Sequence, residues 1–129
     1  MQSLANLAYG EIQQRTASDR ELEHALFQQI TDALEALTKP VEVSASARAD
    51  AVSRNLQMWN ILASDVALPT NALMQETKDS LLYLSAFVRQ MSFAVFEGDE
   101  DKLAELIEVN KAVMSGLLAP SDAQISVGE

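Results

Sequence analysis

The residues able to do acid–base or metal chemistry are few in this chain. His24 is the only histidine and there is no cysteine, so neither a zinc site nor a catalytic triad can be built around it. The carboxylates within residues 97–105 are dense, but they lack the alternating ligands and central glycine of a calcium loop. No glycine pair precedes a Lys-Ser or Lys-Thr, as a phosphate-binding loop requires. The sequence therefore predicts no enzyme, no cofactor and no metal site.

The charge of the chain is strongly acidic. Nineteen Asp and Glu residues stand against nine Lys and Arg, which gives a formal net charge of -10 and a pI near 4.4. Such a chain repels phosphate backbones and anionic lipids, so we expect neither direct nucleic-acid binding nor a membrane partner. The start shows no signal-peptide pattern, and the absence of cysteine fits a reducing compartment. We expect a cytoplasmic protein in which His24 is a surface or boundary residue and residues 97–105 contribute a solvated helix start.

The run at residues 81–96, LLYLSAFVRQMSFAVF, carries apolar side chains on two sides when it is wound as a helix at about 100° per residue. One stripe consists of Leu81, Leu84, Phe87, Val88, Met91 and Val95. The other consists of Leu82, Ala86, Phe93 and Phe96, with Arg89 inside it. The polar residues in the run argue against a membrane span, which needs about 20 apolar positions. The pattern predicts a central helix that needs covering on both sides, by this chain or by a partner.

Capping signals define the first helices. Residues 18–21, Ser-Asp-Arg-Glu, form a capping box, in which the serine and the glutamate satisfy each other's backbone amides. They predict a helix that starts at Ser18 and runs to about Leu37, before a Lys-Pro pair. A connector without glycine follows, and the next helix is expected over residues 47–66 with either Ser44 or Ser46 as its cap.

Proline and glycine set the later boundaries. Pro69 lacks an amide proton and biases the residue before it away from helix, so we assign it a structural role in ending the helix over residues 47–66. The central helix is expected from about Leu73 to Gly98, a left-handed terminator. Asp99 is then expected to cap a last helix whose first turn is acidic.

These signals predict a single all-α domain over residues 1–129. It is a helical bundle of about four to five antiparallel helices, because the connectors are short. Residues 1–16 carry apolar groups at helical spacing, so they form either a short helix or an arm that orders on contact. Residues 120–129 are polar and are expected to form a frayed tail.

Two large side chains on the predicted core faces carry polar groups. Trp59 lies on the core stripe of its helix, so we favour its interpretation as a core residue over that as an interface anchor. Asn110 lies within the apolar stripe of the last helix, where its amide must find partners. We interpret it as a structural amide that bonds a loop carbonyl or a helix end and fixes the packing register.

The second stripe of the central helix leaves two readings open. Leu82, Phe93 and Phe96 either pack within the chain or dock a partner protein. Met58 and Ile61 project away from the core stripe of the neighbouring helix, so in the second case they extend the docking surface. Helix-in-groove recognition would use such an apolar surface with a polar rim.

Short motifs occur along the chain in a definite order. They are Met58-Trp59 with Leu62, then Asp65, Leu68-Pro69 and Asn71-Ala72-Leu73, then Leu81-Leu82 and Phe87-Val88, and last LIEVN at residues 106–110 with Gly116-Leu117. In order and spacing this set resembles the FlaF family of flagellar biosynthesis proteins, and the resemblance spans most of the chain. Met74 stands where that family commonly has a second proline, and Thr77 stands where an apolar residue is usual.

The resemblance implies a helical cytoplasmic protein that binds flagellin and supports its production and export, acting opposite a partner regulator called FlbT. It implies binding and not catalysis. Two other hypotheses stay open. One is a post-transcriptional regulator that contacts flagellin messenger RNA, which the negative charge disfavours. The other is a homodimer in which a second copy covers the second stripe.

Overall fold

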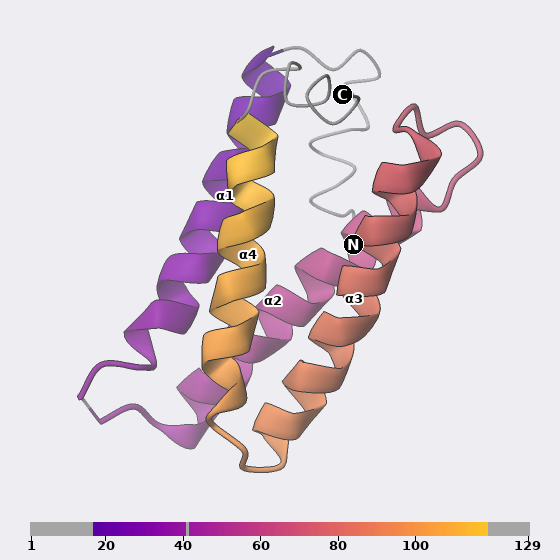
Figure 1. Ribbon diagram of the computed structural model, residues 1–129. Helices are drawn as coiled ribbons and strands as arrows, with labels where there is room; N and C mark the ends of the chain where they lie inside the picture. Colours follow the sequence, from indigo (N-terminus) through magenta and orange to yellow (C-terminus); the bar gives the residue numbers. More distant parts are fainter. Residues whose placement is uncertain (1–16, 41, 119–129) are drawn as a thin grey trace.

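The computed structural model describes residues 17–40 and 42–118, and within them it contains four α-helices and no strand. The helices are α1 (Ala17–Ala36), α2 (Ala45–Val66), α3 (Gln75–Phe96) and α4 (Lys102–Leu118). Successive helices run in opposite directions, which confirms the all-α bundle (Figure 1). The element expected in residues 1–16 and the tail at 120–129 lie outside the described residues.

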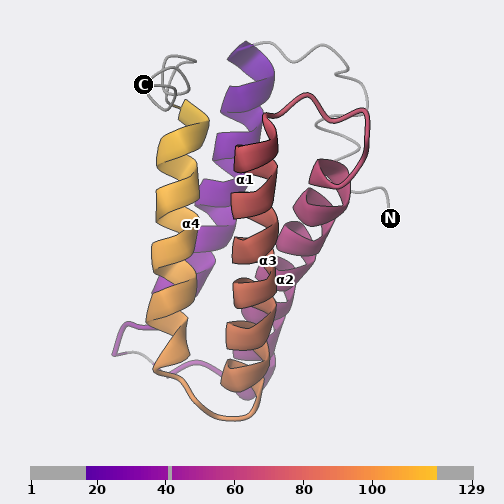
Figure 2. The same ribbon diagram turned by 45° about the vertical axis from the view of Figure 1, so that its right-hand side comes forward.

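The four helices form a ring. α1 packs along α4, α4 along α3, and α3 along α2, while α2 closes the ring against α1 through a smaller contact. Figure 2 shows α3 at the front of the bundle with α4 and α2 on either side of it. α3 is therefore flanked on both sides, as the sequence predicts, but the ring gives it an outer face that none of the other three helices covers.

The first two helices start slightly earlier than predicted. α1 begins at Ala17, one residue before Ser18; the capping box itself stays a prediction, because the side chains of residues 17–20 lie outside the described set. α2 begins at Ala45 instead of residue 47, and the Ser44 hydroxyl accepts a hydrogen bond from the Ala47 amide at 3.0 Å. Ser44 is therefore the cap, and Ser46 is not.

The α2–α3 loop is held together by one asparagine. The Asn71 amide nitrogen donates to the Asp65 backbone carbonyl and to the Asp65 carboxylate, both at 3.2 Å. The Asn71 side-chain oxygen accepts from the Leu73 amide at 2.9 Å. Because the Leu73 amide is engaged in this local turn, α3 starts at Gln75, two residues later than predicted. Pro69 lies in the turn after α2, as expected.

The α3–α4 turn follows the Gly98 prediction but not the Asp99 prediction. Gly98 has φ of 106°, in the left-handed region, and the amides of Gly98 and Asp99 donate to the carbonyls of Val95 and Ala94. These are the two bonds of a Schellman motif. The expectation that Asp99 caps α4 is wrong, because α4 begins only at Lys102, three residues after Asp99. The Asp99 amide instead belongs to the end of α3.

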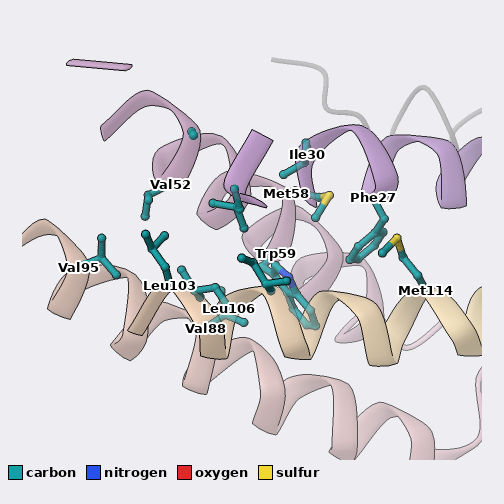
Figure 3. Close-up of a cluster of buried hydrophobic side chains, with 13 residues drawn as sticks. Phe27, Ile30, Val52, Met58, Trp59, Val88, Val95, Leu103, Leu106 and Met114 are labelled. Carbon is teal, nitrogen blue, oxygen red and sulfur yellow. The ribbon is translucent and has the colours of Figure 1, made fainter. Parts of the chain in front are cut away.

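The core lies where the four helices face one another (Figure 3). Its buried apolar side chains are Phe27, Ile30, Leu34, Ala51, Val52, Met58, Trp59, Val88, Val95, Leu103, Leu106, Ile107 and Met114. Trp59 is fully buried, which confirms its core assignment, and Phe27 meets it edge-on with ring centroids 6.0 Å apart. The burial of each helix thus follows its helical periodicity, and differs from the predicted stripes mainly at their edges.

Met58, at the edge of the predicted core stripe of α2, is one such difference. We predicted that it projects away from the core, but it is 6% exposed and belongs to the core cluster. The reason is that α2 contacts α1 on one side and α3 on the other, so it buries a wider arc than a single stripe. Ala51, seven residues before Met58, lies on the same additional part of the arc and is also buried.

Candidate protein-binding face on α3

Two parallel rows of residues run along α3, each with alternating spacings of four and three. We call Leu81, Ser85, Val88, Ser92 and Val95 the inner seam. We call Leu82, Ala86, Arg89, Phe93 and Phe96 the outer seam. The rows are one residue apart, which is about 100° around a helix, and each has the heptad spacing by which one helix pairs with another.

The inner seam is buried and consists mainly of small side chains. Ser85, Val88, Ser92 and Val95 are all at most 4% exposed. The buried Ser92 hydroxyl donates a hydrogen bond to the Val88 carbonyl, one turn earlier in α3, at 2.7 Å. Because serine and valine are small, α3 can lie close to α2 and α4 along this row. The inner seam is therefore the row by which α3 joins the bundle.

The outer seam holds the larger side chains, and it is open to solvent. Phe93 is 51% exposed and Phe96 is 42% exposed; their rings lie next to each other, with centroids 6.2 Å apart and planes tilted by 46°. Leu82 is half-buried, and Ala86 and Arg89 are exposed. The two phenylalanines form a small continuous apolar patch on the helix surface, and such patches often mark protein-binding sites.

The structure brings together part of the predicted docking surface. Leu82, Phe93 and Phe96 share the outer seam, and no described residue buries the two phenylalanines. Met58 is removed from the surface by its burial. Ile61 on α2 is half-buried, as Leu82 is, and its place in the docking surface stays a prediction. The candidate face is therefore carried mainly by α3.

A buried polar network lies inside the bundle. The Trp59 indole nitrogen donates to the Asn110 side-chain oxygen at 2.8 Å. The Asn110 nitrogen donates to the Thr31 hydroxyl at 3.0 Å and to the Asn55 side-chain oxygen at 2.7 Å. All four residues are fully buried, and they connect α1, α2 and α4.

This network corrects the partners that the sequence suggested for Asn110. We expected a loop carbonyl or a helix end, but its partners are three side chains on other helices. Sequence reasoning missed Thr31 and Asn55. The signal was present, because Asn55 lies three residues after Val52 and four before Trp59 and therefore shares their face.

The acidic residues around the α3–α4 turn form ordinary surface ion pairs. Glu100 lies 3.6 Å from the Arg48 guanidinium, and Lys102 lies 3.9 Å from Glu105. Across α1 and α4, Lys111 lies 2.7 Å from Glu35, and this hydrogen bond together with the glutamate charge raises the pKa of Lys111 above its ordinary value. In the described ranges, 17–40 and 42–118, no three potential ligand side chains lie close enough to hold a metal ion.

Two further surface features lie away from the outer seam. An open cleft of about 220 Å³ between α1 and α2 is lined by Gln29, Ile30, Ala33, Ala51 and Arg54. The α2–α3 loop exposes Leu68, Leu73 and Met74, which are between 43% and 53% exposed. The cleft contains a single charged side chain, Arg54, and the exposed residues of the loop do not lie along one helix. We therefore take the outer seam as the candidate binding face.

The fold and this face define the class: an antiparallel four-helix bundle with one apolar helix face turned outward. None of the helices in the described part of the chain is long and apolar enough to cross a membrane. The family model described as flagellar protein FlaF matches residues 5–117, so the chain belongs to the FlaF family. No curated protein and no solved structure matches the sequence.

Proposed function

We propose that this protein acts in the cytoplasm as a flagellin-binding protein that supports flagellin production and export, with the outer seam of α3 as its docking face. The exposed pair Phe93 and Phe96 carries the proposal, together with membership of a family of flagellar proteins. Aromatic side chains presented on a rigid helix are typical anchors of protein interfaces. The activity proposed is binding and not catalysis.

The chemistry of an unpolymerised flagellin fits such a face. A subunit held back from assembly exposes amphipathic helical segments, and one of these can lie along the outer seam with its apolar side against Leu82, Phe93 and Phe96. The net charge of -10 opposes association between copies of this protein and with anionic surfaces. The regulator FlbT is a second proposed partner, through the family relationship alone.

Co-purification with flagellin tests the docking face. Leu82→Asp and Phe93→Asp each place a carboxylate in the outer seam, and we expect each to weaken flagellin binding at least about tenfold, because hot-spot side chains contribute about 2 kcal/mol or more. Circular dichroism establishes that each variant keeps its helices. Unchanged binding by both folded variants would remove the outer seam from the binding site.

Tyr83→Asp is the matched control. Tyr83 is an aromatic residue on the same helix and is 72% exposed, but it lies about 100° around the helix from Leu82. Its replacement introduces the same charge and leaves the outer seam intact. We expect flagellin binding within about twofold of the original protein, because surface changes away from an interface alter binding little.

A further inference from the structure

Arg89 occupies the middle of the outer seam. It lies seven residues after Leu82 and seven before Phe96, with Ala86 and Phe93 as its nearest neighbours in the row. Its side chain is exposed, and among the described residues no carboxylate lies within 4.0 Å of its guanidinium. The outer seam is thus an apolar row interrupted by one unpaired positive charge.

The acidic residues in α3 and directly after it on this side are remote from Arg89. Asp79 lies ten residues before it and Glu97 eight residues after it, which are about 15 Å and 12 Å along a helix axis. The outer seam itself contains no acidic residue. A helix laid along the seam would therefore cover the Arg89 guanidinium without finding a counter-charge on α3.

Self-pairing through the outer seam is consequently disfavoured. Because Arg89 lies at the middle of the row, two copies that overlap along the whole seam bring Arg89 against Arg89 in a parallel or an antiparallel pair. A shifted register would place each guanidinium among the other copy's apolar residues. In both cases the two guanidinium groups lose water and neither gains a carboxylate from the seam, which opposes pairing. A polar residue in a helix-pairing row commonly selects partners in this way.

We propose that Arg89 is the specificity-determining residue of the outer seam, selecting an amphipathic helix that carries an Asp or Glu opposite the guanidinium and excluding a second copy of this chain. A bidentate guanidinium–carboxylate pair supplies both charge compensation and fixed geometry. The remaining negative charge of the protein weakens this pair little, because charges beyond about 8 Å are largely screened at physiological salt. The inference rests on the proposed function, since it names the kind of flagellin segment that docks.

The first experiment measures self-association by sedimentation velocity and needs no partner. Arg89→Leu converts the row into a continuous apolar seam, so we expect self-association at least about tenfold stronger than that of the original protein, which stays monomeric. Adding Phe93→Asp to Arg89→Leu should restore the monomer if the new contact uses the outer seam. Arg54→Leu, which removes an exposed arginine from α2, is the control and should stay monomeric.

Two results of this experiment would overturn the exclusion of a second copy. One is an original protein that already dimerises and becomes monomeric on Phe93→Asp. The other is an Arg89→Leu variant that is as monomeric as the original. Because Arg89 is exposed, the variant is expected to fold, and Arg89→Gln provides a second, milder removal of the charge.

The second experiment measures affinity for purified flagellin. Arg89→Gln should weaken binding about tenfold, because the carboxylate on the partner loses its counter-charge. Arg89→Glu should weaken it about a hundredfold, because two carboxylates then repel each other. Binding by the original protein should also weaken more steeply with salt than binding by Arg89→Gln. Arg54→Gln, which removes an exposed positive charge of α2 and leaves α3 unchanged, should change the affinity less than about threefold.

The outcomes separate the two proposals. If Phe93→Asp abolishes flagellin binding while Arg89→Glu binds as the original does, the docking face stands and the carboxylate partner is overturned. If the original protein does not bind flagellin, the proposed function fails and flagellin is overturned as the partner. The sedimentation experiment still decides in that case whether Arg89 excludes a second copy.

Discussion

The centre of the bundle and the outer face of α3 both depart from the usual distribution of side chains, in opposite directions: the centre buries polar groups and the outer face exposes apolar ones. The centre holds amides and hydroxyls, among them Asn55, Asn110 and Ser92, all without solvent exposure. The outer face holds Phe93 and Phe96, which are about half exposed. Inside, polar groups are acceptable because most of them bond one another, and small ones let helices approach. Outside, large apolar groups serve no packing purpose within the described residues, which is why the outer face is the candidate for function.

The comparison is most directly tested by one aromatic residue from each region. Phe27 is 5% exposed and packs edge-on against Trp59, whereas Phe93 is 51% exposed. We expect Phe27→Ala to lower the free energy of unfolding by about 4 kcal/mol, as for other buried phenylalanines. Phe93→Ala should lower it by less than about 1 kcal/mol. Urea denaturation measures both, and similar losses at the two positions would contradict the assignment of the two regions.

The polar network offers the next largest effect. Asn110→Ala removes the acceptor of the Trp59 indole and the donor to Thr31 and Asn55. We expect a loss of about 3 kcal/mol in the free energy of unfolding, because buried polar groups are left without partners. Thr31→Val removes a single bond of the network at nearly unchanged side-chain volume and should cost less. A neutral Asn110→Ala would show that the network does not stabilise the bundle.

The inner seam contains one polar atom whose removal should stabilise the protein. The Ser85 hydroxyl is buried and has no hydrogen-bond partner among the described residues, whereas the Ser92 hydroxyl is bonded. Ser85→Ala should therefore raise the free energy of unfolding by about 1 kcal/mol, since an unsatisfied buried group is removed. Ser92→Ala is the control and should not raise it. Destabilisation by Ser85→Ala would indicate that its hydroxyl is satisfied.

The smallest effect is expected at the surface, between α1 and α4. The hydrogen bond from Lys111 to Glu35 raises the lysine pKa above 10.5 in the folded protein. The stability from this pair is therefore fully present below pH 10.5 and is lost as the pH rises through the folded pKa. Denaturation midpoints should differ slightly between the original protein and Lys111→Met below pH 10.5 and converge above it. A difference that grows with pH would contradict the assigned ion pair.

Much of the fold could be predicted from residue spacing. Helical periodicity placed Trp59 on the buried face of its helix, and the left-handed turn at Gly98 was correctly predicted to end α3. The sequence also placed Leu82, Phe93 and Phe96 on one face of α3, because residues three and four apart share a face of any α-helix. These predictions depend only on the geometry within one helix.

What the sequence could not decide concerns relations between helices. Periodicity showed two apolar rows on α3 but gave no reason to bury Ser85 and Ser92 while exposing Phe93. It also placed Met58 outside the core, although α2 faces two neighbours and buries it. A sequence pattern fixes angles around a helix's own axis, whereas the position of each neighbouring helix depends on packing by the whole chain. That packing determined which row joins the bundle, which amides meet at Asn110, and which face remains for a partner.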